Sequence, residues 1–168
     1  MAQNQNTHAI DLHDGTIIHA PDQTGAHVCN QGNLGVFDTT LNSGLGGTRD
    51  VVTQADLAKF VGVALQNSIL NSLNDVELTV EYAFKNVFKF KTTAGDVYTH
   101  LAPVYYNETA ADANTVTVST NSGARTVIVG YVVLSGENIM NGILSVTGAT
   151  NVQIQVAVRA NYPVAALA

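Results

Sequence analysis

The chain has 168 residues, enough for one domain with a substantial core. Only 12% of the residues are charged, and 13 Asp and Glu against 7 Lys and Arg give a net charge of −6. This balance argues against nucleic-acid binding, because no basic stripe is available to neutralise a phosphate backbone. The low charge also predicts that a partner, or further copies of the chain, cover part of the surface.

The sequence gives no sign of export or membrane insertion. Its first residues, MAQNQNTHAIDLHDG, lack the positive and apolar regions of a signal peptide. No apolar run reaches the roughly 18 residues that a spanning helix requires. Cys29 is the single cysteine, so an intramolecular disulfide and a CxxC metal motif are both excluded. We expect a protein made in the cytoplasm, without a membrane partner.

The first half of the chain predicts an arm followed by short strands. Residues 1–10 are polar and unpatterned, which predicts a flexible N-terminal arm, and residues 11–168 are expected to form a single β-domain. Short strands are expected at 16–20 and 36–38, with a glycine-rich loop at 41–47. Thr53 is an N-cap candidate with Asp56 three positions later, which predicts one short helical turn.

The middle of the chain alternates between apolar and polar residues. A strand with a central glycine is expected over Phe60–Leu65. Val76–Lys91 then predicts two strands around a turn at Lys85-Asn86. In the first strand Glu77 and Glu81 lie on the solvated side, and in the second Phe88 and Phe90 oppose Lys89 and Lys91.

The stretch from Gly95 to Leu134 contains the clearest strand pattern. Apolar and aromatic residues follow a Gly-Asp turn and continue around a break at Pro103, before a polar tip at 107–114. Val116–Ser119 and the β-branched run Thr126–Leu134 come next. Period-two alternation with Gly and Asn punctuation predicts consecutive antiparallel strands here.

The C-terminal part predicts two more strands. Glu137–Gly142 is expected to be a loop, Ile143–Thr147 is short and apolar, and Asn151–Arg159 alternates. The whole chain therefore predicts nine to eleven strands. The fold class is all-β: a compact antiparallel β-barrel or sandwich with at most one or two short helices and an extended N-terminal arm.

Residues that could support catalysis or metal binding do not form a recognised pattern. His8, His13, His19 and His27 lie close to Cys29, but their spacings match no structural zinc motif. Cys29 lacks a nucleophile elbow and is expected to be a small buried hydrophobic residue. The glycine-rich loop lacks the strand-then-helix context of a phosphate site. We therefore expect no catalytic residues, no metal and no cofactor.

Two groups of aromatic residues fit either a core or a partner surface. The tyrosines are Tyr98, Tyr105 and Tyr106, and the phenylalanines are Phe84, Phe88 and Phe90. Core packing is the preferred interpretation, and a binding hot spot is the alternative.

The order of short motifs between Phe60 and Arg159 resembles the small capsid decoration, or cement, proteins of tailed bacteriophages. The motifs are GVAL at Gly62–Leu65, VYY at Val104–Tyr106, IVGYVV at Ile128–Val133 and a closing VQIQVAVR strand. The chain departs from that pattern in its longer N-terminal part, in apparent insertions at 66–75 and 135–150, and in Gln153 and Gln155 of the closing strand, where charges are commoner.

The resemblance implies a structural virion protein rather than an enzyme. It would be a homotrimer on the outside of an icosahedral head, bridging copies of the major capsid protein and stabilising the shell. The N-terminal arm is expected to add a strand to a capsid sheet, through Ala2, Gln3, Asn4, Gln5, Asn6, Thr7, His8, Ala9 and Ile10.

Three alternatives remain open from the sequence. The first is a head-fibre or tail module that binds glycans or a receptor. The second is a small β-barrel metal-dependent hydrolase or lyase that uses His13, His19 or His27. The third is a bacterial protein of similar fold with no role in a virion.

Overall fold

A computed structural model of the protein describes residues 16–19, 21–22, 27–68, 80–83, 86–110, 116–123, 125 and 127–159. The described residues form twelve strands, one short α-helix and three 3-10 turns, so the predicted all-β class is confirmed. Contacts gather in two compact units, one comprising residues 1–51, 59–85 and 161–168 and the other residues 52–58 and 86–160. The prediction of a single domain over 11–168 stays a prediction.

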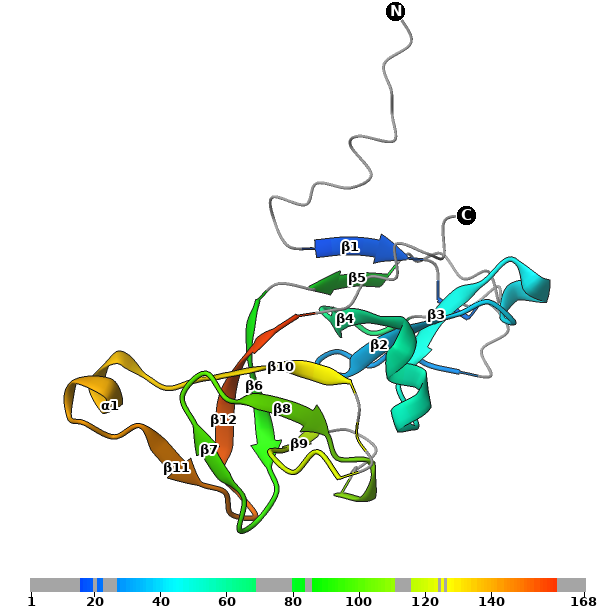
Figure 1. The fold of residues 1–168 in the computed structure, drawn as a ribbon. Coiled ribbons are helices and arrows are strands. Elements are labelled where there is room, and N and C mark those ends of the chain that lie inside the picture. The colour runs from blue at the N-terminus through cyan, green and yellow to red at the C-terminus, as the bar shows by residue number, and fades with distance from the viewer. Residues whose placement is uncertain are drawn as a thin grey trace, which may run out of the picture. The chain divides into compact units, whose positions relative to one another are not determined.

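The first unit contains a five-stranded sheet in the order β1-β5-β4-β2-β3 (Figure 1). Its strands are β1 (Thr16–His19), β2 (Leu34–Asp38), β3 (Gly47–Asp50), β4 (Phe60–Ala64) and β5 (Val80–Ala83), all paired antiparallel. All five residues of β4 are buried, which places this apolar strand inside the unit.

The Tyr82 ring lies so close to β2 that only glycine fits at position 35 of this sheet. A Cβ atom on Gly35 would lie 2.0 Å from Cε1 of Tyr82, and the β2–β4 register shifts between Gly35 and Val36. Tyr82 belongs to a buried cluster that also contains Cys29, Val61, Ala64 and Val80. The glycine therefore makes room for the largest side chain of the cluster.

The second unit contains a closed barrel in the order β10-β12-β6-β9-β8. The barrel strands are β6 (Val87–Thr92), β8 (Pro103–Tyr106), β9 (Thr117–Ser119), β10 (Ile128–Val133) and β12 (Gln153–Val158). Four of the five pairings are antiparallel, and β6 pairs with β9 in parallel. Alternate residues of β12 are buried, namely Ile154, Val156 and Val158, as the sequence predicts.

Two strands and a helix lie together at one side of this barrel (Figure 1). Strand β7 (Val97–Thr99) pairs antiparallel with β11 (Ser145–Thr147), and helix α1 (Gly136–Met140) precedes β11. None of the helices in the described part of the chain is long and apolar enough to span a membrane.

Helix α1 corrects the prediction of a loop over Glu137–Gly142. The Ser135 hydroxyl accepts a hydrogen bond from the Asn138 N–H at 3.2 Å, which caps the helix. Gly142 has a φ of 72°, and its N–H bonds the Ile139 carbonyl, which ends the helix. The helix has only five residues, too few for an amphipathic period to be visible in the sequence.

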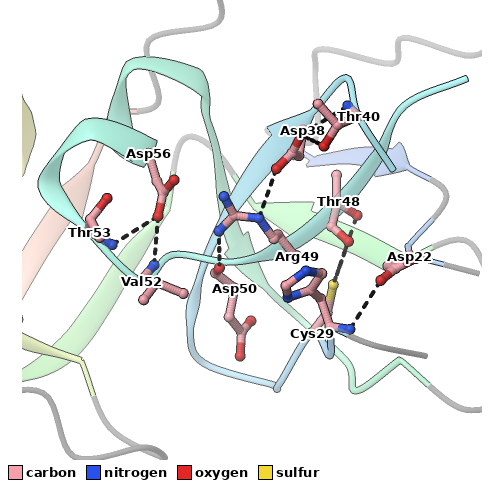
Figure 2. Close-up of polar contacts among 11 residues, drawn as sticks. Asp22, Cys29, Asp38, Thr40, Thr48, Arg49, Asp50, Val52, Thr53 and Asp56 are labelled. Atoms are coloured by element: carbon pink, nitrogen blue, oxygen red, sulfur yellow. Dashed lines mark hydrogen bonds and ion pairs between the residues drawn. The ribbon is translucent and has the colours of Figure 1, made fainter. Parts of the chain in front are cut away.

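The predicted helical turn after Thr53 is a 3-10 helix, Gln54–Lys59. The Asp56 carboxylate accepts hydrogen bonds from the N–H groups of Val52 and Thr53, at 3.0 and 2.8 Å (Figure 2). An acidic side chain that reaches back to the first N–H groups of a helix is half of a capping box. The acidic residue at this position was therefore a correct signal.

Candidate functional site

The predicted capsid-binding arm, Ala2–Ile10, lies outside the described residues, as do His8 and His13. Of the other predicted metal-ligating histidines, His19 is placed only as a residue of β1, and His27 is exposed. The backbone N–H of His27 donates to the Asp22 carboxylate at 3.1 Å. Within the described ranges, no three His, Cys, Asp or Glu side chains lie close enough to hold a metal ion.

Cys29 is buried, and its thiol is hydrogen-bonded to its neighbours rather than exposed as a nucleophile. Its thiol donates to the Thr48 carbonyl at 3.3 Å (Figure 2), and the Tyr82 hydroxyl donates to its sulfur at 2.9 Å. Burial raises the pKa of the Cys29 thiol above its ordinary value, and burial also raises the pKa of Tyr82. A neutral, enclosed thiol is inert, so the prediction that Cys29 is a buried hydrophobic residue is confirmed.

The carboxylates of the first sheet fix loops and the β2–β3 hairpin. Asp50 accepts from the side-chain amides of Asn30 and Asn33 at 2.6 and 2.8 Å, yet burial raises its pKa. Asp38 accepts from the N–H and hydroxyl of Thr40 and pairs with the Arg49 Nε at 3.1 Å (Figure 2). These contacts lower the pKa of Asp38 to about 2.

The glycine-rich segment 41–47 closes on itself. The Asn42 side-chain amide donates to the carbonyls of Gly46 and Pro21, both at 2.9 Å. Asn42 and Ser43 have positive φ values of 54° and 59°, which tighten this turn. Its backbone carbonyls and the Asn42 amide are directed at each other, so the segment is a structural turn.

The predicted aromatic groups divide between core and surface. Tyr98, Tyr106 and Phe90 are buried, whereas Tyr105 and Phe88 are partly exposed, and Phe84 lies outside the described residues. The preferred core interpretation therefore holds for the three buried rings.

The strongest functional feature is an apolar surface on the β7–α1–β11 side of the second unit. We call the segments 97–101 and 135–147 the apolar lobe. Of the ten large hydrophobic residues that are exposed in the described part of the chain, six belong to it, so the exposure is concentrated rather than scattered. They are Val97 (52% exposed), Leu101 (66%), Ile139 (39%), Met140 (89%), Ile143 (44%) and Leu144 (57%).

Backbone hydrogen bonds join these segments to one another. Val97 faces Thr147 in the β7–β11 ladder, and the His100 N–H donates to the Leu144 carbonyl at 2.9 Å. The Ile143 N–H donates to the Asn138 carbonyl at 2.8 Å, which ties α1 to the start of β11. The exposed residues therefore lie on neighbouring stretches of backbone.

The lobe carries almost no charge. Glu137 is the single charged residue in 97–101 and 135–147. Burying such a surface against another apolar surface is favourable, because few charged groups have to be removed from water.

Buried hydrogen bonds hold the lobe to the barrel. The Tyr98 hydroxyl donates to the Val118 carbonyl at 2.6 Å and accepts from the Thr93 N–H at 2.8 Å. On the other side, the Thr92 hydroxyl bonds the carbonyls of Ala149 and Val152, both at 3.0 Å. The Tyr98 hydroxyl therefore ties β7 to the barrel, and the Thr92 hydroxyl holds the loop that follows β11.

A pocket of about 250 Å³ lies beside the lobe. Its apolar lining is Val133, Leu134, Val146 and Ile154, and its polar lining is Lys89, Ser135, Asn138, Gln153 and Gln155. The volume suits one large side chain, and the lining combines an apolar surface with groups that can bond a backbone.

This surface was not predicted from the sequence, because the pattern over 137–142 indicates a loop and that over 143–147 an ordinary short strand. A usable signal was present. The segment NIMNGIL at 138–144 sets four large apolar residues in a stretch without strand alternation, where no sheet face is available to bury them.

Comparison with known proteins yields no relative on which to base a function. No family model, no curated protein and no solved structure matches this chain.

Proposed function

We propose that this protein is a structural virion protein that binds the outside of an icosahedral phage head and stabilises the capsid as a decoration, or cement, protein. The observation that carries a role in protein assembly is the apolar lobe, which exposes six large hydrophobic residues beside a single charge. The assignment to a phage head comes from the resemblance of Phe60–Arg159 to capsid decoration proteins.

Three further properties support binding over catalysis. The charged share of 12% leaves much of the surface suited to contact with protein. The candidate nucleophile Cys29 is used inside the first unit, bonded to Thr48 and Tyr82. The carboxylates of Asp38 and Asp50 accept hydrogen bonds from Thr40 and Asn30 of the neighbouring loops.

The proposed mechanism is multivalent attachment. A homotrimer that engages several copies of the major capsid protein gains affinity through effective concentration, even where each contact is weak. In this proposal residues Ala2–Ile10 add a strand to a capsid sheet edge, where backbone hydrogen bonds fix the register.

Binding to expanded phage heads tests the proposal. Purified protein is mixed with heads, and the pelleted fraction is measured as a function of protein concentration. We expect saturable binding by the full chain, and loss of binding by a variant that lacks residues 2–10 but keeps its oligomeric state and circular dichroism spectrum. Full occupancy by the truncated variant would refute the role of the arm.

Absence of saturable binding to any head preparation would refute the decoration function itself. In that case a glycan array and metal analysis of the purified protein distinguish the first two of the three alternatives. Specific glycan binding would favour the head-fibre or tail module, and a stoichiometric metal would favour the hydrolase.

A further inference from the structure

We propose that a second copy of this chain covers the apolar lobe, so that the lobe is the surface through which the protein self-associates. The inference rests on the proposed role of the lobe as a binding surface and names the partner of that surface. It assigns subunit contact to 97–101 and 135–147, and so leaves attachment to the capsid to other parts of the chain.

The area of the lobe matches what a stable protein interface requires. With roughly 180 Å² for a fully exposed aliphatic residue, the six exposed fractions correspond to about 600 Å² of surface. A standard interface buries roughly 800 Å² on each partner, of which about 60% is nonpolar. The lobe alone therefore supplies the nonpolar content of one side of such an interface.

The scarcity of charge on the lobe disfavours a partner of opposite charge and leaves a second copy possible. The chain carries a net charge of −6, which opposes the approach of two copies at most orientations. The lobe has only Glu137, so two lobes meet where the mutual repulsion is weakest. A basic partner would find no cluster of acidic residues to bind on this surface, and the lobe offers it no charge complementarity.

Shape supplies a specific contact for the second copy. Met140 is 89% exposed at the end of α1, and the pocket beside the lobe has a volume of about 250 Å³, with four apolar and five polar residues in its lining. An unbranched Met side chain adapts to irregular pockets. A large apolar side chain of one copy that enters the pocket of the other is the kind of central anchor that dominates interface energetics.

The backbone conformation of Leu101 is a further indication. It is 66% exposed and has a φ of 64°, a conformation that bulky residues rarely adopt. Hydrogen bonds of its own N–H to the Val132 carbonyl and of the Val132 N–H to the Ala102 carbonyl, both at 2.9 Å, hold it there. Backbone strain that keeps an apolar side chain in solvent is typical of binding surfaces.

Sedimentation velocity of the full chain tests the proposal, at protein concentrations from about 1 to 100 µM. The test variants are Met140→Asp alone and Met140→Asp combined with Leu144→Asp, and Leu45→Asp is the matched control for the single change. Leu45 is 88% exposed, nearly the same as Met140, but belongs to the first unit. All three residues are exposed, so the variants are expected to keep the wild-type circular dichroism spectrum and melting temperature.

We expect the wild type and Leu45→Asp to form the same oligomer, and the test variants to dissociate more easily, the double variant by at least about 100-fold. A wild type that stays monomeric throughout the range would overturn the proposal, and so would a double variant that associates as tightly as the wild type. Heads are then added to the same samples. A monomeric wild type that binds heads overturns only this inference, whereas a lobe-dependent oligomer that ignores heads overturns only the decoration function.

Discussion

Replacing Gly130 by alanine tests how tightly the barrel is closed. Gly130 lies in β10 with a neighbour on each side, Val158 of β12 and Val104 of β8. A Cβ atom at this position would lie 2.3 Å from the Ala157 carbonyl oxygen and 2.7 Å from Cγ1 of Val156. The nearest obstacle is backbone, which cannot rotate away as a side chain can.

The size of the expected effect follows from the overlap. Ordinary contact begins at 3.4 Å, so β10 and β12 must separate locally by about 1 Å, which lengthens ladder hydrogen bonds beyond useful range. A closed barrel cannot absorb this shift by moving a free edge. Overpacking of this kind costs about 1–3 kcal/mol, and we expect Gly130→Ala to lower the free energy of unfolding by about 3 kcal/mol, at the upper end of that range.

Gly136→Ala is the matched control, because it makes the same chemical change in the same unit. Gly136 is the first residue of α1, and a Cβ atom there would meet no atom within 4 Å. Alanine is favoured over glycine in helices by about 0.5–1 kcal/mol, so this variant is expected to be as stable as the wild type or slightly more stable. Urea unfolding followed by circular dichroism and tyrosine fluorescence measures both. A loss below about 1 kcal/mol for Gly130→Ala would refute the steric argument.

Two further predictions concern the first unit. Contacts with Thr40 and Arg49 lower the pKa of Asp38 from 3.8 to about 2, so Asp38 stabilises the fold above pH 4, and this contribution is lost as the pH falls from about 4 to 2. Because Asp38 is near the surface, we expect its contribution to the free energy of unfolding to be about 1 kcal/mol. It is measured by comparing the stability of wild type and Asp38→Asn as the pH falls from about 4 to 2, and parallel curves of stability against pH would contradict it. The Cys29 thiol is expected to react with Ellman's reagent at pH 8 only after urea unfolds the protein, because it is buried and its pKa is raised. Rapid labelling of the folded protein would show that the thiol is accessible.

Strands with regular alternation, such as β12, or with a short apolar run, such as β4, were predictable from the sequence, and a short polar strand was not. In β12 the alternating sequence QIQVAV predicts which residues are buried, and these residues are buried in the structure. Strand β3 was missed because its sequence, GTRD, contains no large apolar residue. Strand β3 forms because its backbone pairs antiparallel with β2. Backbone hydrogen bonds of this kind do not require particular residue types, so the sequence does not indicate them.

There is a different reason why closure of the barrel could not be predicted. It depends on a parallel pairing of β6 with β9, in which Lys91 faces Thr117. Such a contact joins strands separated by two others in the chain, and hairpin signals report only neighbouring strands. Pro103 illustrates the same limit, because it indicates a break in the sequence, yet it begins β8, where the missing N–H is tolerated.

The candidate surface was hidden because residue type alone does not separate core from interface. Tyr98 and Met140 are both large and apolar, but Tyr98 is fully buried and Met140 is 89% exposed. The difference arises from the β7–β11 pair, which turns Tyr98 toward the barrel and leaves α1 without a covering element among the described residues.

The way the lobe is anchored bears directly on how tightly it can bind. Association is weakened by the ordering of loops and side chains at the interface, by about 0.5–1.5 kcal/mol for each flexible side chain. The Tyr98 hydroxyl already ties β7 to the barrel through hydrogen bonds, and the Thr92 hydroxyl holds the loop that follows β11. These hydrogen bonds limit the backbone ordering that association requires, and much of the remaining loss falls on side chains such as Met140. An apolar surface that is preorganised in this way needs few polar contacts to bind well, which is consistent with a lobe that carries only Glu137 as a charge.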